Sequence, residues 1–281
     1  MDAESIAAVT GARAVVVGAR IQTLWGGYGE IVRARIDGTA AVVKEVRPPP
    51  GDGPSHLRKL RSYDVELAWY RRHAARSPAR VARYLGGARG LIVLEDLDEA
   101  GYTGRRGDAY QCLAWLARFH LAFRDTSIDD LWDRGTYWHL GTRLDELPRI
   151  ADPALREAAP LFDARLRASP FRTLLHGDAK PDNFCFGPAD VAAVDFQYVG
   201  PGCALSDVAY LICGDPDEDA KLDRYCAHLR ELGAPELEGE ARAVYPFAAA
   251  DFYRFLAGWA PHRWPQERHG QRVVRDALRA L

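Results

Sequence analysis

Residues 174–186 read LLHGDAKPDNFCF and are the most informative stretch of the sequence. An apolar run leads into this stretch, and Asp178 and Asn183 follow on a polar loop. A second short apolar run, residues 191–194, ends at Asp195. Short apolar runs that end in acidic side chains predict short strands whose polar ends build a site. A hairpin-like arrangement would bring Asp178, Asn183 and Asp195 together.

These three residue types fit phosphoryl transfer. That reaction needs a carboxylate near the attacking hydroxyl, and it needs oxygen ligands for Mg2+, which bridges phosphate oxygens and offsets charge in the transition state. The alternative is three surface polar residues in unrelated loops. The spacing, the order and the flanking apolar runs all favour the site.

The pattern His176-x-Asp178-x-x-x-x-Asn183, followed by Asp195 after an apolar run, resembles the catalytic loop and metal-binding Asp of the protein-kinase-like superfamily. Its His-Gly-Asp opening resembles the aminoglycoside phosphotransferase and choline kinase branch, and the stretch to Ile212 is most similar to ecdysteroid-kinase-like phosphotransferases. The resemblance implies an ATP- and Mg2+-dependent phosphotransferase that acts on a hydroxyl of a small-molecule acceptor. It also implies a bilobal α+β fold, with a small antiparallel-sheet N-lobe and a larger, mainly helical C-lobe.

The resemblance assigns a role to each matching position. Asp178 would be the catalytic base that orients the acceptor hydroxyl, and Lys180 would contact the γ-phosphate. Asn183 and Asp195 would bind Mg2+. Asp207, in the segment Ser-Asp-Val-Ala-Tyr, matches a structural acid that braces the catalytic loop.

Lys44 lies inside the apolar run of residues 40–46. Alone, such a lysine is as well explained as an edge or solvent-facing residue. In a kinase-like N-lobe it would bind the α- and β-phosphates and pair with a glutamate of the following helix. Glu66 is the candidate partner, with Glu45 and Asp64 as nearby competitors.

Two further segments belong to the expected nucleotide site. Gly26, Gly27 and Gly29 form a glycine-rich turn between two predicted strands, which is either a plain hairpin or a loop whose N–H groups cover the phosphates. The segment Glu95, Asp96 and Leu97 resembles the hinge that holds adenine through its backbone, although a plain acidic turn explains it as well. No Gly-x-x-x-x-Gly-Lys-Ser/Thr motif is present, which argues against a P-loop kinase.

The order of predicted elements gives the domain organisation. Strand-like runs and a helix over residues 55–75, with Ser55 as its N-cap, fill the first third. We therefore expect an N-lobe over residues 1–95, a hinge over 96–101 and a C-lobe over 102–281. His120, near the end of an amphipathic helical stretch, is expected to be a packed histidine.

Composition limits the classes of partner that we expect the protein to bind. The chain of 281 residues has a formal net charge of −2, which does not favour nucleic acid or an anionic membrane as a partner. We find neither a signal-peptide pattern nor a long apolar run, so no membrane association is expected. The five cysteines form no Cys-x-x-Cys pair, which indicates reduced thiols in a cytoplasmic protein.

The sequence leaves the acceptor open. The aromatic residues of the last two-thirds are either core or the walls of an acceptor site, and Asp251 or the acids between Asp215 and Asp219 could bind an amine. Two other functions stay as alternatives, a protein Ser/Thr kinase and a catalytically inactive nucleotide-binding module. The first lacks a visible peptide-docking segment between Asp195 and Asp207, and the second would be expected to have lost a site residue.

Overall fold

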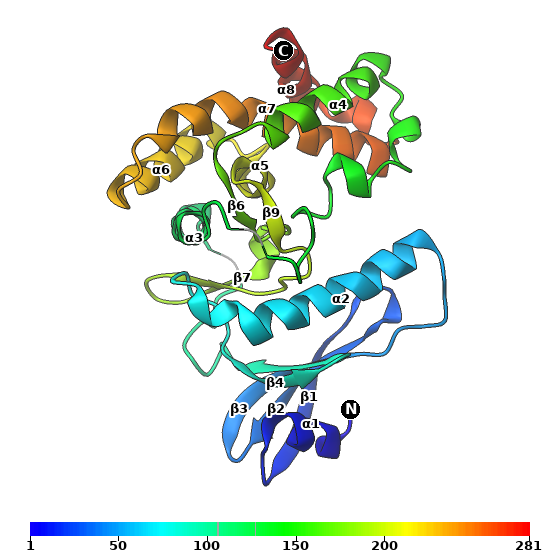
Figure 1. The fold of residues 1–281 in the computed structure, drawn as a ribbon, viewed down its shortest axis with the longest axis vertical. Helices are drawn as coiled ribbons and strands as arrows, with labels where there is room; N and C mark the ends of the chain where they lie inside the picture. Colours follow the sequence, from blue (N-terminus) through cyan, green and yellow to red (C-terminus); the bar gives the residue numbers. More distant parts are fainter. Residues whose placement is uncertain (106, 127) are drawn as a thin grey trace. The chain divides into compact units, whose positions relative to one another are not determined.

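The computed structural model describes residues 1–105, 107–126 and 128–281. The chain divides into two compact units (Figure 1). Unit 1 comprises Met1–Gly107 and Asp182–Gln197, and unit 2 comprises Asp108–Pro181 and Tyr198–Leu281.

Unit 1 is built on a five-stranded antiparallel sheet with strand order β1-β2-β3-β5-β4. The strands are β1 Val15–Thr23, β2 Gly29–Ile36, β3 Thr39–Val46, β4 Tyr84–Ala88 and β5 Leu91–Glu95. Two helices, α1 Ala3–Thr10 and α2 Pro54–Arg72, accompany the sheet, and Figure 1 shows α2 running along it. The antiparallel sheet and the mainly helical unit 2 confirm the predicted α+β fold class.

The pleat of the sheet places an apolar core on one of its two faces. Ile6 of α1 packs against buried side chains of three strands, namely Val32, Ala34, Ala41, Val43, Leu91 and Val93. Since successive side chains of a strand point to opposite faces, Lys44 points away from this core. The opposite face is the one that α2 covers.

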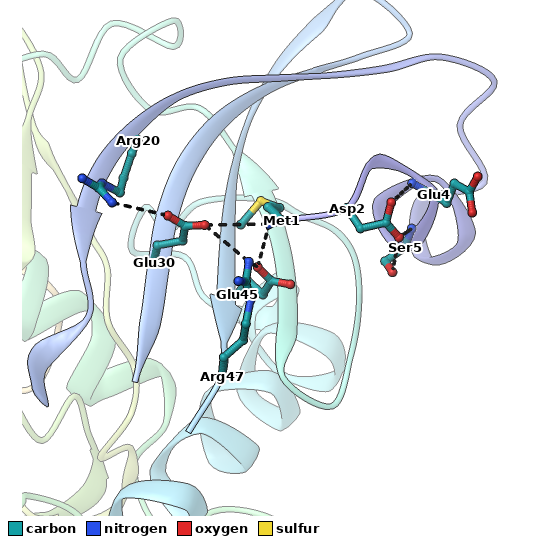
Figure 2. Close-up of polar contacts among 8 residues, drawn as sticks. All are labelled: Met1, Asp2, Glu4, Ser5, Arg20, Glu30, Glu45 and Arg47. Carbon is teal, nitrogen blue, oxygen red and sulfur yellow. Dashed lines mark hydrogen bonds and ion pairs between the residues drawn. The ribbon is translucent and has the colours of Figure 1, made fainter. Parts of the chain in front are cut away.

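A network of charged groups crosses β1, β2 and β3 beside the N-terminus (Figure 2). The Met1 amine lies 3.8 Å from Glu30 and 3.4 Å from Glu45. Arg20 and Arg47 join the same acids through side chains that are 64% and 57% exposed. Ion pairs with exposed side chains contribute little to stability. We therefore expect this network to add little to the free energy that stabilises the sheet.

Two details of unit 1 differ from the sequence prediction. Helix α2 begins at Pro54 after Gly53, and Ser55 lies inside the first turn, so the predicted Ser55 N-cap is wrong. The proline ring fixes a backbone angle suited to the first helical position, which moves the start forward by one residue. The sequence also predicts two separate strand-like runs before the glycine turn, over residues 14–17 and 21–25, whereas the structure has one irregular strand, β1, with register shifts between Val17 and Gln22.

A second, smaller hairpin completes unit 1. It consists of β7 Phe184–Phe186 and β8 Val191–Ala193, preceded by the short helix η5 Pro181–Asn183. Phe186 exchanges two backbone hydrogen bonds with Gly104 (2.9 and 3.0 Å), and Phe196 stacks on Trp69 of α2 with ring centroids 4.9 Å apart. These contacts hold the end of the hairpin beside α2.

Unit 2 is mainly helical. Its helices are α3 Ala109–Ala122, α4 Pro153–Arg167, α5 Leu205–Ile212, α6 Glu218–Glu231, α7 Leu237–Trp259 and α8 Arg268–Arg279, and its two strands are β6 Arg172–Leu175 and β9 Gly200–Cys203. Helix α7 packs against α4, α5, α6 and α8, as Figure 1 shows. No helix in the described ranges is long and apolar enough to span a bilayer. All five cysteines are free.

We expect Gly29→Ala to destabilise the protein by about 3 kcal/mol, because a Cβ there would lie 2.0 Å from the carbonyl oxygen of Glu45 on β3. The backbone of Gly29 also has a φ of +139°, which L-residues rarely adopt. Urea denaturation measures the free energy of unfolding. Gly38→Ala is the matched control, since its φ is +83° but no atom lies within 4 Å of the added carbon. It should cost only about 1 kcal/mol, and equal losses would contradict the steric argument.

Buried His139 should make stability depend on pH. Burial first, and then Arg134, Arg254 and Arg143, lower its pKa to about 3. The folded protein keeps this imidazole neutral, whereas the unfolded chain protonates it near pH 6.5. Stability from this residue is therefore complete above pH 6.5 and is lost as pH falls toward 3.

Between pH 7.5 and pH 5.0 the free energy of unfolding should fall by about 2 kcal/mol because of His139, since each pKa unit corresponds to about 1.36 kcal/mol. The variant His139→Gln should not show this loss. Urea denaturation of both proteins at the two pH values measures this difference. A variant with the same pH dependence as the parent would show that His139 is not the group responsible.

Candidate active site

Unit 1 brings together three of the predicted site residues, with Glu66 and Asp195 on either side of Lys44. The Nζ of Lys44 donates to Glu66 Oε2 at 2.6 Å and to Asp195 Oδ1 at 2.9 Å. Lys44 and Glu66 are buried, at 6% and 2% exposure. The competing acids point elsewhere, since Glu45 pairs with Arg47 and Asp64 lies 3.4 Å from Arg89. Glu66 is thus the helix glutamate that meets Lys44.

Burial and charge act in opposite directions on this cluster. Burial alone would lower the pKa of Lys44, but the carboxylates of Asp195 and Glu66 raise it above its ordinary value. Burial raises the pKa of Glu66, and the Lys44 charge only partly offsets this effect. Lys44 therefore stays cationic at neutral pH.

Helix α2 adds contacts that sequence reasoning missed. Lys59 Nζ donates to Gln197 Oε1 at 2.8 Å, and Ser62 Oγ lies 3.2 Å from the same oxygen. The ammonium groups of Lys59 and Lys44 lie 4.9 and 5.5 Å from the ring centroid of Tyr63. Lys59 precedes Glu66 by seven positions, or two helical turns, so the helical period was the available signal.

The small hairpin positions the two candidate metal ligands. Phe184 pairs with Ala193, and Val194 N donates to Asn183 O at 2.9 Å, so Asn183 and Asp195 lie at the same end of β7 and β8. Asp195 has a left-handed backbone, with φ +66°, a conformation that Asp tolerates better than most residues. Its side chain is 35% exposed.

This donor set fits Mg2+ in chemistry, because the amide and carboxylate offer the hard oxygen atoms that Mg2+ prefers. No cluster of three or more His, Cys, Asp or Glu able to hold a metal occurs among the described residues. Mg2+ is commonly held by one or two protein ligands together with substrate phosphates. Asn183 and Asp195 would serve as such a pair, with the phosphates completing the coordination.

The glycine turn closes on itself. Gly26 and Gly27 have φ angles of +70° and +76°, and Gly27 N donates to Leu24 O at 3.0 Å. Leu24 N in turn donates to Gly29 O at 2.8 Å. The amide of Gly27 is therefore engaged inside the turn, and phosphate covering by the turn stays a prediction.

The predicted hinge uses its side chains for structure. Glu95, the last residue of β5, accepts from Arg80 at 2.8 Å and from Arg83 N at 3.0 Å. Asp96 is 4% exposed and accepts from Arg33 at 2.5 Å, and Leu97 is buried. Adenine recognition at this segment stays a prediction. The backbone N–H and C=O groups, and not the side chains, would form the hydrogen bonds with adenine.

Unit 2 holds the remaining pair, Asp178 and Lys180. Strand β6 delivers the loop, and Lys180 Nζ lies 3.0 Å from Asp178 Oδ2. Gly177 has a φ of +82°, and a Cβ there would lie 2.1 Å from Tyr198 O. Only glycine fits this position, so the His-Gly-Asp sequence reflects a close backbone approach.

A buried carboxylate organises the same loop. Asp207 accepts from the backbone N of His176 at 2.6 Å and from Gly177 N at 3.0 Å. The Nε2 of His120 lies 3.3 Å from Asp207, and its Nδ1 lies 2.8 Å from the hydroxyl of Tyr225. His120 is fully buried, as expected, but it also belongs to this polar chain. The contacts are those expected of a brace.

Tyrosine hydroxyls lie beside Asp178. Tyr137 and Tyr210 share a hydrogen bond of 2.8 Å. Burial and then the charge of Asp178 raise the pKa of Tyr210, while burial raises that of Tyr137 to about 12. Both hydroxyls therefore remain protonated. Of the other aromatic residues, Trp138, Tyr253 and Trp264 are core, whereas Trp259 is 52% exposed.

Known structures share this fold. A protein described as a fructosamine-3-kinase from Thermobifida fusca is 21% identical, with 99% of this chain and 97% of that chain covered and a TM-score of 0.61. Choline kinase from Streptococcus pneumoniae is 15% identical, with 94% and 93% covered and a TM-score of 0.55. An amicoumacin kinase in complex with AMP-PNP, Ca2+ and Ami is 15% identical, with 97% and 92% covered and a TM-score of 0.58.

No curated protein sequence matches the chain. The family model described as the phosphotransferase enzyme family (APH) matches residues 21–243, which is most of the sequence. The match confirms the resemblance to the aminoglycoside phosphotransferase branch that the His-Gly-Asp motif indicated. The chain belongs to the phosphotransferase enzyme family.

Proposed function

We propose that the protein transfers the γ-phosphoryl group of ATP, in the presence of Mg2+, to a hydroxyl group of a small-molecule acceptor. The observation that carries this proposal is the buried Lys44, held between Glu66 and Asp195 at 2.6 and 2.9 Å. A buried ion cluster of this kind is costly to maintain without a ligand that uses its charge. The amicoumacin kinase complex with AMP-PNP and Ca2+ shows nucleotide and divalent-cation binding for one protein of this fold.

The residues of unit 1 would bind ATP, the phosphoryl donor. Mg2+ would neutralise charge on the phosphates, and Asn183 and Asp195 would be its protein ligands. Lys44 would bind the α- and β-phosphates, and Glu66 fixes its ammonium group in position. Gly26, Gly27, Gly29 and the backbone of Glu95, Asp96 and Leu97 are proposed to border the nucleotide.

The residues of unit 2 would act on the acceptor. Asp178 would accept a hydrogen bond from the acceptor hydroxyl, orient its oxygen toward the γ-phosphorus and take up its proton as the new P–O bond forms. Lys180 Nζ lies 3.0 Å from Asp178 Oδ2, and Lys180 would contact the γ-phosphate. Asp207 holds the backbone of this loop through His176 and Gly177.

A small acceptor is favoured over a protein. The chain between Asp195 and Asp207 forms strand β9, which pairs along β6, and then enters α5. The residues of β9 and α5 are therefore part of the packed structure of unit 2 and are not arranged as a surface that docks a peptide. The lobe boundaries 1–95, 96–101 and 102–281 and a cytoplasmic location remain part of the proposal.

A phosphorylation screen tests the proposal. Purified protein should release ADP in a Mg2+-dependent manner with one class among choline, aminoglycosides, macrolides, sugars and sterol-like alcohols. Asp195→Ala should abolish this turnover, because it removes the carboxylate that binds the metal and Lys44. Asp182→Ala, which removes an exposed acid next to Asn183, is the matched control and should keep activity. Near-normal turnover of Asp195→Ala would show that the metal assignment is wrong.

With a working acceptor, Asp178→Asn should lower kcat by about 10²-fold or more, the usual scale of a general-base contribution. The change keeps the shape of the side chain but removes its charge and its capacity to accept the proton. Nucleotide affinity, measured by calorimetry with AMP-PNP, should stay within about twofold because Asp178 is proposed to face the acceptor. Parallel losses of nucleotide affinity and turnover would indicate a structural or metal-binding Asp178 instead.

A further inference from the structure

Unit 2 contains a cavity of about 250 Å³ that the proposed phosphoryl transfer does not use. Four parts of unit 2 form its wall: the end of α4, strands β6 and β9, the start of α5, and the segment before Tyr137. Its lining includes Asp133, Arg134, Thr136, Arg167, Arg172 and Ser206. Its volume lies below the usual range of ligand pockets, about 300–1,000 Å³, so it suits a small metabolite and not a nucleotide.

The charge of the wall is predominantly positive. Three arginines face one acid, Asp133, across the lining. Arg134 forms an ion pair with Asp163. For Arg167 and Arg172 no ion pair is formed with any residue in the described part of the chain, and the NH1 of Arg172 donates to the carbonyl of Arg167 at 3.3 Å. Both arginine side chains are exposed, and two neighbouring guanidinium groups attract an anion because their N–H donors match its oxygen atoms.

The chemistry of these groups selects the ligand. Guanidinium groups bind phosphate and carboxylate oxygens through paired hydrogen bonds. The hydroxyls of Thr136 and Ser206 belong to the same lining and can donate to further oxygens or to the hydroxyls of the ligand. An oxyanion group on a small polar skeleton satisfies both kinds of donor.

The wall of the cavity is joined directly to the catalytic loop. Gly135 N donates to Pro201 O at 2.9 Å, Thr136 N to Tyr198 O at 3.2 Å and Tyr137 N to Gly177 O at 3.3 Å. Thr136 is buried and has a φ of +70°, a strained conformation for a β-branched residue. Strain of this kind is found at functional sites, and here it lies between the cavity and the residue before Asp178.

We propose that this cavity binds a small metabolite carrying a phosphate or carboxylate group, at a site separate from those of the phosphoryl donor and acceptor. Arg167 and Arg172 bind the oxyanion, and Thr136 and Ser206 bind the rest of the ligand. The proposal concerns binding and does not depend on the proposed phosphotransferase activity.

Calorimetry on the full chain tests the site with three probes: inorganic phosphate, glycerol 3-phosphate and citrate. At least one should bind in the millimolar range or tighter, and the double variant R167Q/R172Q should weaken that binding at least about tenfold. Phosphate esters and citrate distinguish the two ligand classes. The double variant R268Q/R275Q removes two positive charges from exposed positions on α8 and should leave binding unchanged.

Three outcomes would overturn the proposal. The first is that no probe binds at 10 mM, roughly the weakest affinity that counts as a site. The second is binding that R167Q/R172Q leaves unchanged. The third is binding that Lys44→Ala abolishes while the arginine double variant does not, which would place the anion at the nucleotide site. Thermal denaturation of each variant without probe confirms that the arginine changes have not unfolded the protein.

Discussion

The buried charge of Lys44 is the constraint on which the rest of unit 1 depends. A lysine at 6% exposure is tolerated only with carboxylates at hydrogen-bond distance. The sheet supplies the lysine, α2 supplies Glu66, and the β7–β8 hairpin supplies Asp195, 151 positions further along the chain. Each element has its own reason to form, but the ion cluster requires all three to meet. The stacking of Phe196 on Trp69 holds the last of them in place.

Asp207 has the corresponding role in unit 2. Its carboxylate is 1% exposed and accepts two backbone N–H groups of the His-Gly-Asp loop. The imidazole of His120 approaches the same carboxylate, and Tyr225 holds that imidazole from its other side. A buried acid that binds backbone donors fixes the path of the loop more firmly than apolar packing alone, because every broken bond would leave a charge unpaired.

The sequence predicted the parts of this architecture that depend on local pattern. The glycine turns, the strand carrying Lys44 and the order of Asp178, Asn183 and Asp195 follow from periodicity and motif. The contacts of His120 with Tyr225 and of Lys59 with Gln197 could not be predicted, since they join residues 105 and 138 positions apart. Strand β9 reads Gly-Pro-Gly-Cys, a composition that indicates a turn. It is extended only because β6 pairs with it.

The charges of unit 2 bear on how the proposed acceptor would be recognised. Asp251 is fully buried and bound to Arg254 at 2.8 Å, and Asp215 forms an ion pair with Lys221. An amine that used Asp215 would have to displace Lys221, and Asp251 is closed off from solvent, which makes both poor amine sites. The tyrosine hydroxyls beside Asp178 remain protonated and can donate to an acceptor oxygen. Their use would displace no bound cation. Recognition through hydroxyl groups and aromatic faces is therefore better matched to this unit than recognition of a positive charge by those acids.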